Sequence, residues 1–429
     1  MKKNSELTLY YQDVRYSWQG LCQQISALSH TPALQKKNTD SIFCLAPVLA
    51  KDRFLTTLYL LYGFSEKRTV IPLSNDYSDS ERSTMFKQVN ACCLKNISLA
   101  IATSGSQAKP KIALINQNNI VSHCQSFSTV IPLDNQTVWL NCMPMNHIAG
   151  VIIIYRCWFN NATMVLHDEF DAKKIWDDIH RYKVSHISLV PKMLSRLLDY
   201  QMEYAQDVLP PKHLKYVIIG GDRLSGSLYR RADSAGWSIY ISYGMTETTS
   251  TVAIGRTADT LKLLDGFDAH ISSQGTLTIK GSMVISAYAG SNRDEIQNAC
   301  FEKGCFKSND LVELDERYIK ITGRNDHMII SGGKNIAPEY IETLLSSVPG
   351  IDDIAIGKYR YPDCKEEWGD TIVALVCGNS KQLKHWLQEH VKPCYQPRIF
   401  IEVEKIPRNS LGKINRKKIQ LLVDATKNL

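Results

Sequence analysis

The sequence predicts an α/β protein with a large N-terminal domain of doubly wound sheets plus a small distorted β-barrel, and a small α+β C-terminal domain. Predicted strands and helices alternate over residues 41–241, short alternating strands follow residue 250, and a mixed segment follows residue 326. Strand–helix alternation is typical of parallel sheets covered by helices. A chain of 429 residues also exceeds what one hydrophobic core usually supports, so we expect two or three folding units.

The alternation starts after an opening helix over residues 18–28. Apolar runs predict strands over residues 41–46, 69–73, 97–102, 137–141, 163–166, 186–190, 216–219 and 238–241. Helical spacing of apolar residues predicts helices over residues 52–62, 78–89, 148–159, 172–181, 193–204 and 224–235. In doubly wound sheets, ligands bind beyond the carboxyl ends of the strands. Gly220-Gly221 and Tyr243-Gly244 fall at two such ends.

The pattern changes after residue 250. Predicted strands over residues 269–271, 276–280, 311–314 and 318–321 indicate an antiparallel sheet or distorted barrel. Beyond a turn at residues 323–326, helices are predicted over 338–346 and 381–390, and strands over 354–357, 371–376 and 399–403. That is enough for a small independent domain.

Composition narrows the function classes. The net charge of +7 is scattered, apart from a basic run at residues 413–418, which favours anionic small substrates over nucleic acid. The 12 cysteines form no Cys-x-x-Cys pair, which argues against a zinc site or a secreted disulfide scaffold. The N-terminal lysines precede no apolar signal core, and the most apolar stretch, residues 149–155, is too short to span a bilayer. We therefore expect a cytoplasmic protein without a membrane span.

Residues 103–111, Thr-Ser-Gly-Ser-Gln-Ala-Lys-Pro-Lys, follow a predicted buried strand. Backbone amides near Gly105, the hydroxyls of Ser104 and Ser106, and the charge of Lys109 or Lys111 are suited to gripping a phosphate. A solvated turn is the simpler interpretation of the same residues. The usual nucleotide P-loop is excluded, because it requires Gly-Lys-Ser/Thr at the start of a helix.

Four more stretches require explanation alongside this loop. They are residues 243–248, 304–310, 323–336 and 406–414. Taken singly, Glu247 is also explained as a surface carboxylate, Asp310 as a turn cap and Lys413 as a solvated lysine. Together they make a chemical set: the loop grips phosphates, Glu247 beside Thr246 holds Mg²⁺ on ATP, Asp310 and Arg324 hold ribose hydroxyls, and Lys413 reaches the reacting oxygens.

This set, in this order, resembles the acyl-adenylate-forming superfamily of acyl-CoA synthetases, adenylation domains and luciferases, from about residue 40 to residue 420. The resemblance implies an N-terminal AMP-binding domain over residues 1–324, a mobile C-terminal domain over 327–429, and a hinge at 325–326 centred on Asp326. It implies two steps: a carboxylate attacks the α-phosphate of ATP to give acyl-AMP and pyrophosphate, and a thiol then displaces AMP. ATP, Mg²⁺ and coenzyme A are the implied cofactors and co-substrate.

The resemblance also assigns roles to residues. It implies catalytic roles for Lys413, Glu247, Lys111 and Thr246, with Glu247 holding the metal. Nucleotide binding is implied for Thr103, Ser104, Gly105, Ser106, Gly220, Gly221, Asp222, Tyr243, Gly244, Asp310 and Arg324. His147 matches a gate beside the acyl pocket, although a lone histidine is more often structural. The glycines of Ser331-Gly332-Gly333 leave room for the pantetheine arm of CoA or a related thiol.

Two departures from the family pattern stand out. Gln107-Ala108 replaces a small flexible pair, and alanine adopts positive φ less readily than glycine, which puts the mobility of the phosphate loop in question. Asn309 replaces a glycine before Asp310, which is a milder change because asparagine tolerates the left-handed region.

The short segment after Glu247, without the common Gly-x-Pro-x-Pro-Gly loop, looks most like the o-succinylbenzoate–CoA ligases of menaquinone biosynthesis. The acid substrate would then carry a second carboxylate, and Arg223 or Lys192 is a candidate to meet it, with surface charge as the simpler explanation for both. Two alternatives stay open: an adenylation enzyme for another small aryl or aliphatic acid with CoA or a carrier protein as acceptor, and a nucleotide-binding pseudoenzyme. The sequence also leaves a homodimer open.

Overall fold

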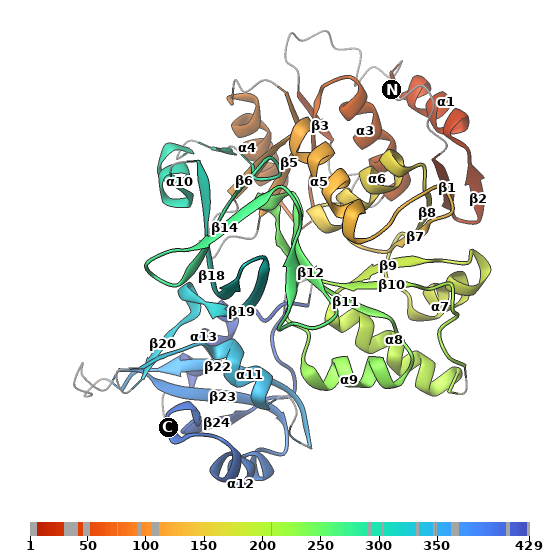
Figure 1. Cartoon of the computed structure of the whole chain (residues 1–429). Coiled ribbons are helices and arrows are strands. Elements are labelled where there is room, and N and C mark those ends of the chain that lie inside the picture. Colours follow the sequence, from red (N-terminus) through yellow and green to blue (C-terminus); the bar gives the residue numbers. More distant parts are fainter. Residues whose placement is uncertain are drawn as a thin grey trace.

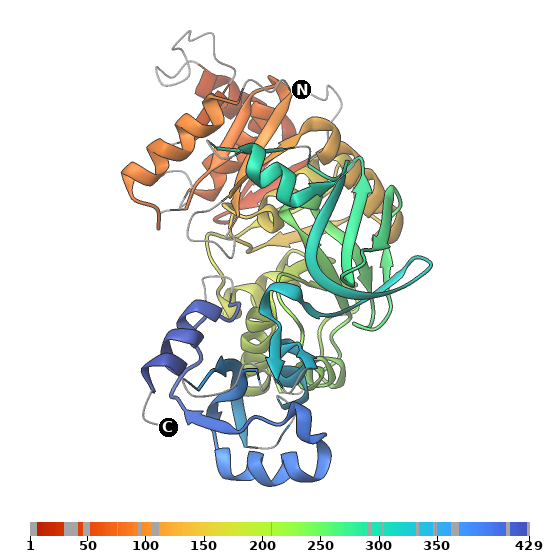
Figure 2. The ribbon, with the colours of Figure 1, turned by 90° about the vertical axis from the view of Figure 1, so that its left-hand side faces the viewer.

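The computed structural model describes residues 7–29, 42–45, 52–74, 76–92, 96–103, 111–206, 208–285, 287–290, 293–302, 304–331, 334–345, 348, 350–361, 369–408 and 412–426. Its architecture is mixed α/β, as predicted (Figure 1). A five-stranded sheet and a 14-stranded sheet make up the larger part of the described chain, and a three-stranded sheet organises the C-terminal part. Both views place this C-terminal part at the end of the molecule opposite the five-stranded sheet (Figure 2).

The five-stranded sheet has the order β16-β6-β5-β4-β3. Its strands are β3 (Ile42–Leu45), β4 (Thr69–Pro72), β5 (Ile97–Thr103), β6 (Lys111–Asn116) and β16 (Ala287–Ala289). β3, β4 and β5 run parallel, whereas β6 is antiparallel to both β5 and β16. The helices of this region are α1 (Trp18–Ser29), α3 (Arg53–Ser65), α4 (Asp79–Asn90), α5 (Gln117–Val130) and α10 (Arg293–Cys300).

Local signals explain where these helices begin. The Asp52 side chain accepts from the amide of Leu55 and caps α3. Ser78 and Glu81 form a reciprocal capping box at the start of α4. The sequence analysis predicted both helices but missed α5 and β6.

The larger sheet begins as the predicted doubly wound layer. Its parallel strands are β1 (Thr8–Tyr11), β8 (Thr163–Leu166), β7 (Val138–Asn141), β9 (His186–Leu189), β10 (Tyr216–Ile219) and β11 (Ile239–Met245), with β2 (Val14–Tyr16) antiparallel to β1 at the edge. The connecting helices are α6 (Ile148–Asn160), α7 (Ala172–Arg181), α8 (Pro191–Tyr204) and α9 (Gly226–Ser234). Strand register is continuous: Ile187 pairs with Val217, and Val217 pairs with Ile239.

The predicted barrel strands continue this same sheet. Beyond β11, neighbouring strands are antiparallel to one another. Their order is β12 (Ser250–Gly255), β13 (Leu261–Leu263), β19 (Tyr318–Arg324), β18 (Cys305–Asp315), β15 (Thr276–Gly281) and β14 (Phe267–Ile271). The short strand β17 (Phe301–Glu302) also pairs with β18. One hydrophobic core extends beneath both portions and includes the fully buried Trp139, Tyr155 and Phe127. The junction at β11 and β12 therefore belongs to both portions of the sheet.

The C-terminal part has hydrophobic cores of its own. A short 3-10 turn, η3 (Asn325–His327), leads into the hairpin of β20 (Ile329–Ser331) and β21 (Lys334–Ile336). The three-stranded sheet then has β23 (Thr371–Gly378) between β22 (Ile351–Tyr359) and β24 (Ile399–Glu402). It is accompanied by α11 (Pro338–Leu345), α12 (Ser380–His390), a 3-10 turn η5 (Pro393–Tyr395) and α13 (Arg416–Ala425).

Candidate functional site

The carboxyl ends of β9, β10 and β11 meet at one edge of the large sheet, where the sequence predicted a ligand. The amide of Gly220 donates to the carbonyl of Leu189 at 3.1 Å, which joins the ends of β9 and β10. Gly221 follows with φ +82°, and a Cβ there would lie 3.2 Å from Val190 Cγ1. A side chain at Gly221 would therefore be strained by its backbone and crowded by Val190, the residue that follows β9.

The last residues of β11 are shaped by a tight contact with β12, and the strand runs through Tyr243 and Gly244 to Met245, beyond the predicted end at residue 241. The strand register shifts between Tyr243 and Gly244, and a Cβ on Gly244 would lie 2.0 Å from the carbonyl oxygen of Ser250. Only glycine fits at this approach. The chain then forms a single 3-10 turn, η2 (Thr246–Thr248), which carries Glu247 beyond the strand end.

Glu247 lies in a cluster that joins three parts of the fold. Its carboxylate accepts from the hydroxyl of Tyr288 at 2.8 Å, and Tyr288 belongs to β16 of the smaller sheet. Burial first, and then the charge of Glu247, raise the pKa of the Tyr288 phenol well above its ordinary range, so this phenol is a hydrogen-bond donor near neutral pH. Lys111, the first residue of β6, lies with Nζ 3.4 Å from Cys300 Sγ and 5.7 Å from the centre of the Tyr288 ring.

Asp310 and Arg324 form the predicted acid–base pair. They face each other across β18 and β19, and Arg324 Nη1 donates to Asp310 Oδ1 at 2.9 Å. The second Asp310 oxygen accepts from the Tyr243 hydroxyl at 2.6 Å, which ties this pair to β11. Asp310 is only 7% exposed, so both partners are needed to satisfy its buried carboxylate.

The same arginine holds the predicted hinge residue. Arg324 Nε and Nη2 each donate to Asp326 at 2.9 Å, and the Asn309 amide reaches Asp326 at 3.3 Å. Burial alone would raise the pKa of Asp326, but the hydrogen bonds and charge of Arg324 lower it below its ordinary value. A forked, charge-assisted contact of this kind fixes the direction of the chain as it leaves β19.

His147 and Lys413 belong to different parts of the chain but lie within electrostatic reach of each other. His147 is the N-cap residue of α6 and forms no side-chain capping bond, while Lys413 precedes α13. Burial lowers the pKa of His147 to about 4, with a further contribution from the positive charge of Lys413. Burial raises the pKa of Asp222, after β10, while the charges of Lys413, Arg408 and Arg416 oppose that shift. Lys413 thus lies within electrostatic reach of two residues at the strand-end edge.

We expect the His147 imidazole to remain neutral from pH 8 to pH 5. An unfolded histidine titrates near pH 6.5, so between that pH and about pH 4 the unfolded state binds more protons than the folded state does. The stability that neutral His147 contributes is therefore fully present above pH 6.5 and is lost as the pH falls toward about pH 4. The measurement is a histidine NMR titration, with His147→Gln to assign the signal. Lys413→Ala should raise the midpoint, and a His147 midpoint near pH 6.5 in the unsubstituted protein would contradict the expected shift.

Other predicted site residues are placed less completely. Thr103 ends β5 and its hydroxyl donates to the carbonyl of Lys111 at 3.3 Å, but Ser104, Gly105, Ser106 and the Gln107-Ala108 pair lie outside the described residues. Thr246 opens η2 beside Glu247. Ser331 ends β20, where it bridges to Gly369, whereas Gly332 and Gly333 also lie outside the described residues.

The structure adds contacts that the sequence analysis did not foresee. Tyr288 and Cys300 join the Glu247 and Lys111 region, and no spacing signal links them to it because their distance along the chain is large. Of the two cations considered for a second substrate carboxylate, Arg223 lies within electrostatic reach of Glu339 and Glu342 in α11. A Cβ on Gly412 would lie 3.3 Å from Lys192 Cβ. Both cations therefore face the C-terminal part of the chain.

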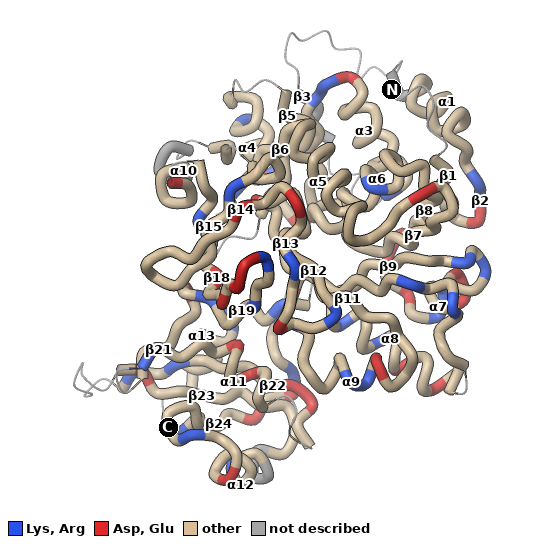
Figure 3. Tube along the Cα trace, viewed as in Figure 1, with Lys and Arg blue, Asp and Glu red and all other residues tan. Residues whose placement is uncertain are grey.

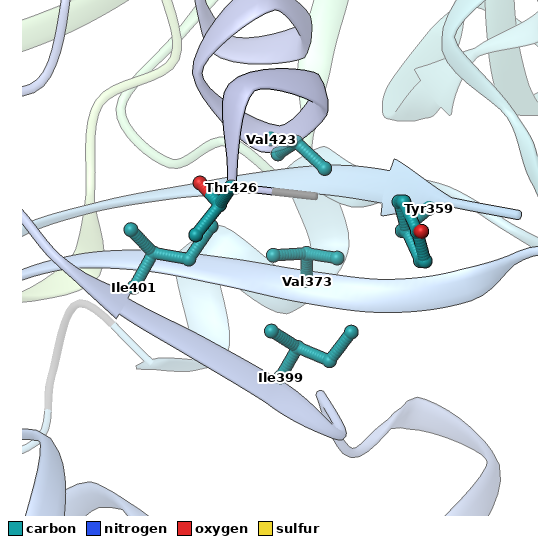
Figure 4. A pocket seen from close by; sticks show the side chains of 6 residues that line it. All are labelled: Tyr359, Val373, Ile399, Ile401, Val423 and Thr426. Atoms are coloured by element: carbon teal, nitrogen blue, oxygen red, sulfur yellow. The ribbon is translucent and has the colours of Figure 1, made fainter. Parts of the chain in front are cut away.

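Basic and acidic residues are interspersed along the tube in Figure 3, in keeping with the scattered net charge. A small apolar pocket lies between the C-terminal sheet and α13, far along the chain from the strand-end residues (Figure 4). Its lining side chains are Tyr359, Val373, Ile399, Ile401, Val423 and Thr426. Because these side chains are mostly apolar, the candidate site lies at the carboxyl ends of β9, β10 and β11 and not in this pocket.

The donor set near Glu247 fits a hard cation. Carboxylate and hydroxyl oxygens suit Mg²⁺, which usually binds through one or two protein carboxylates together with substrate phosphates. Within the described ranges, no group of three His, Cys, Asp or Glu side chains is arranged to hold a metal ion. A single carboxylate such as that of Glu247 is the kind of ligand set that Mg²⁺ uses where substrate phosphates supply the remaining ligands. In the same part of the chain, every helix is too short or too polar to cross a membrane.

Comparison with known proteins decides the family. The sequence profile of the AMP-binding enzyme family matches residues 33–285. The chain belongs to the AMP-binding enzymes. The 2-succinylbenzoate–CoA ligase of Staphylococcus aureus strain MSSA476 is 30% identical over 344 residues, covering 76% of this chain and 67% of that protein. The enzyme of the same name from Lactococcus lactis is 28% identical over 342 residues, covering 76% and 71%.

Solved structures confirm the fold of this AMP-binding enzyme. The Bacillus subtilis o-succinylbenzoate CoA synthetase with its acyl-adenylate OSB-AMP superposes with a TM-score of 0.81 at 21% identity, covering 97% of this chain and 96% of that one. ATP-bound MatB from Rhodopseudomonas palustris gives a TM-score of 0.82 at 18% identity, covering 98% and 97%. The predicted fold and the predicted class, an AMP-forming acid–thiol ligase, are therefore confirmed by these homologues.

Proposed function

We propose that this AMP-binding enzyme converts 2-succinylbenzoate to its CoA thioester through an acyl-adenylate. The observation that supports the proposal is the pair of hydrogen-bonded sets next to the end of β11, Glu247 with Tyr288 and Asp310 with Arg324 and Tyr243. The positive charge of Lys413 acts on His147, at the start of α6. Relatives named 2-succinylbenzoate–CoA ligase support the choice of acid.

In the first step, a carboxylate oxygen of the acid attacks the α-phosphorus of ATP, the bond to the bridging oxygen breaks, and pyrophosphate leaves. Negative charge gathers on the oxygens of the α-phosphate and of the leaving pyrophosphate. Lys413 contributes positive charge at the attacking carboxylate and the ribose side of the α-phosphate, and Lys111 contributes it nearer the phosphate chain. Positioned charge of this kind accounts for most of the protein's contribution to such a reaction.

The remaining roles at ATP follow from the donor sets. Glu247, with Thr246 beside it, would hold Mg²⁺, which neutralises phosphate charge when bound; a solved structure of the Bacillus subtilis synthetase contains ATP and a magnesium ion. The Asp310 carboxylate, which is paired with Arg324, would accept from the ribose hydroxyls. Gly220, Gly221 and Asp222 would form the adenine edge, with Gly244 beside it in the close contact between β11 and β12. Thr103, Ser104, Gly105 and Ser106 would form the phosphate loop.

In the second step, the thiol sulfur of CoA attacks the acyl carbon, AMP leaves with its phosphate oxygen, and the thiol proton is released. We propose that the domain of residues 327–429 rotates against residues 1–324 about residues 325–326 between the two steps. Asp326, held by Arg324, is then the position where the chain must change direction. Ser331, Gly332 and Gly333 would line the pantetheine tunnel. The need for ATP and CoA agrees with the expected cytoplasmic location. The homodimer remains a prediction.

Pyrophosphate exchange with a panel of acids tests the proposal. We expect exchange with 2-succinylbenzoate, and weaker exchange with two fragments: 4-oxo-4-phenylbutanoate, which lacks the ring carboxylate, and benzoate, which lacks the succinyl arm. Exchange with another acid only would replace the substrate and keep the reaction class. Absence of exchange with every acid, together with tight binding of ATP, would favour a nucleotide-binding pseudoenzyme.

A further inference from the structure

Arg408 connects the segment that carries Lys413 to the rigid sheet of the C-terminal part. Its Nη2 and Nε donate to the two oxygens of Asp353 at 2.7 and 3.1 Å. Its remaining terminal nitrogen, Nη1, donates to the carbonyl of Gly412 at 2.8 Å. We propose that Arg408 is a positioning residue that holds Lys413 in the position and orientation needed for adenylation. The proposal rests on the role of Lys413 in the proposed function.

The bond to Gly412 acts directly on Lys413. The carbonyl of Gly412 belongs to the peptide unit whose nitrogen is that of Lys413, and a peptide unit is planar. Fixing this carbonyl therefore fixes where the Lys413 side chain starts. The neighbouring backbone closes around the same point: Arg408 bridges to Ile414, and the amide of Asn415 donates to the carbonyl of Pro407 at 2.9 Å.

Asp353 provides a firm base for this contact. It belongs to β22, which pairs continuously with β23 from Asp353 to Tyr359, and the following residues Ile354 and Ala355 are buried in the two C-terminal cores. The Arg408 and Asp353 side chains keep 25% and 34% of their exposure, so the ion pair itself stabilises the fold little. The ion pair instead fixes geometry, because a forked arginine–carboxylate contact holds the Arg408 guanidinium in a single orientation.

Residues 412–415, which carry Lys413, also lie close to α8 of the larger part of the protein. Gly412 has φ +83°, and a Cβ there would lie 3.3 Å from Lys192 Cβ and 3.6 Å from Lys192 Cδ. Lys192 stands in the first turn of α8, next to the strand-end edge. Gly412 is thus bonded to Arg408 and has little free space toward Lys192, so losing the Arg408 bond would change where Lys413 lies relative to the strand-end edge.

The experiment separates the two half-reactions. Arg408→Met should lower the maximal rate of acid-dependent pyrophosphate exchange by about ten- to a hundredfold, the effect of a misplacement of about 1 Å, with the KM values for ATP and acid unchanged. Thioester formation from supplied acyl-AMP should keep its rate. Arg408→Lys should fall between, added guanidinium should restore part of the Arg408→Met loss, and Asp353→Asn should add little to Arg408→Met. Lys405→Ala, an exposed cation in the same segment, is the matched control.

The outcomes distinguish this inference from the proposed function. If Lys413→Ala lowers exchange and the Arg408 variants do not, Arg408 is not a positioning residue and the proposed function stands. If Lys413→Ala has no effect, the role of Lys413 itself fails. Equal losses in both half-reactions, or losses in Arg408→Lys as large as in Arg408→Met without guanidinium rescue, would indicate a merely structural role and overturn the inference.

Discussion

Replacing Lys413 with alanine is expected to lower acid-dependent pyrophosphate exchange by about 10²–10³-fold, the usual loss when one preorganised charge is removed from a transition state. The charge of Lys413 is felt at His147 and Asp222, at the edge where the α-phosphate is proposed to react. Thioester formation from supplied acyl-AMP should change little, because that step does not create the charge that Lys413 meets. The two rates are measured separately on the same preparation.

The control for Lys413→Ala is Lys417→Ala, which removes another exposed lysine four residues along the chain. It should leave both half-reactions unchanged. A comparable loss in both half-reactions of Lys413→Ala would contradict a role confined to adenylation, and unaltered exchange would remove Lys413 from the site.

Replacing Glu247 with glutamine is expected to give the second large effect, again about 10²–10³-fold in exchange. Glutamine keeps the size of the side chain and an oxygen that can accept from Tyr288, so it removes the charge with little change in packing. The concentration of Mg²⁺ needed for half-maximal exchange should rise, because a neutral amide is a poorer ligand for this cation. A magnesium titration of the exchange rate gives both quantities.

Tyr288→Phe is the matched variant for Glu247→Gln. It removes the 2.8 Å hydrogen bond but leaves the carboxylate charge, so its loss should be smaller and its magnesium dependence close to normal. An unchanged magnesium dependence in Glu247→Gln would show that Glu247 does not hold the metal, even if the rate falls.

Helix α5 and the long-range contacts of its Asn119 side chain could not be predicted from local patterns. The sequence of α5 is rich in Asn, Ser and Thr, which are weak helix formers, and the helix depends on capping by Asn116 and on packing. Asn119 donates to the carbonyls of Ser282 and Val284, more than 160 residues away, so its environment is set by another part of the fold. Such long-range satisfaction of a buried amide leaves no signal within a local window.

The sequence by itself determined the alternation of strands and helices, because burying an apolar face imposes a period on the residues that cover it. It also determined that β10 ends just before Gly220, and it predicted the acid, the arginine and the lysine of the proposed site, whereas β11 runs on to Met245, beyond the predicted strand. Only the tertiary structure decided that the antiparallel strands extend the parallel sheet, that Tyr288 meets Glu247, and that Arg408 links Asp353 to the carbonyl before Lys413. These contacts depend on strand order and domain placement, which join residues that no local pattern connects.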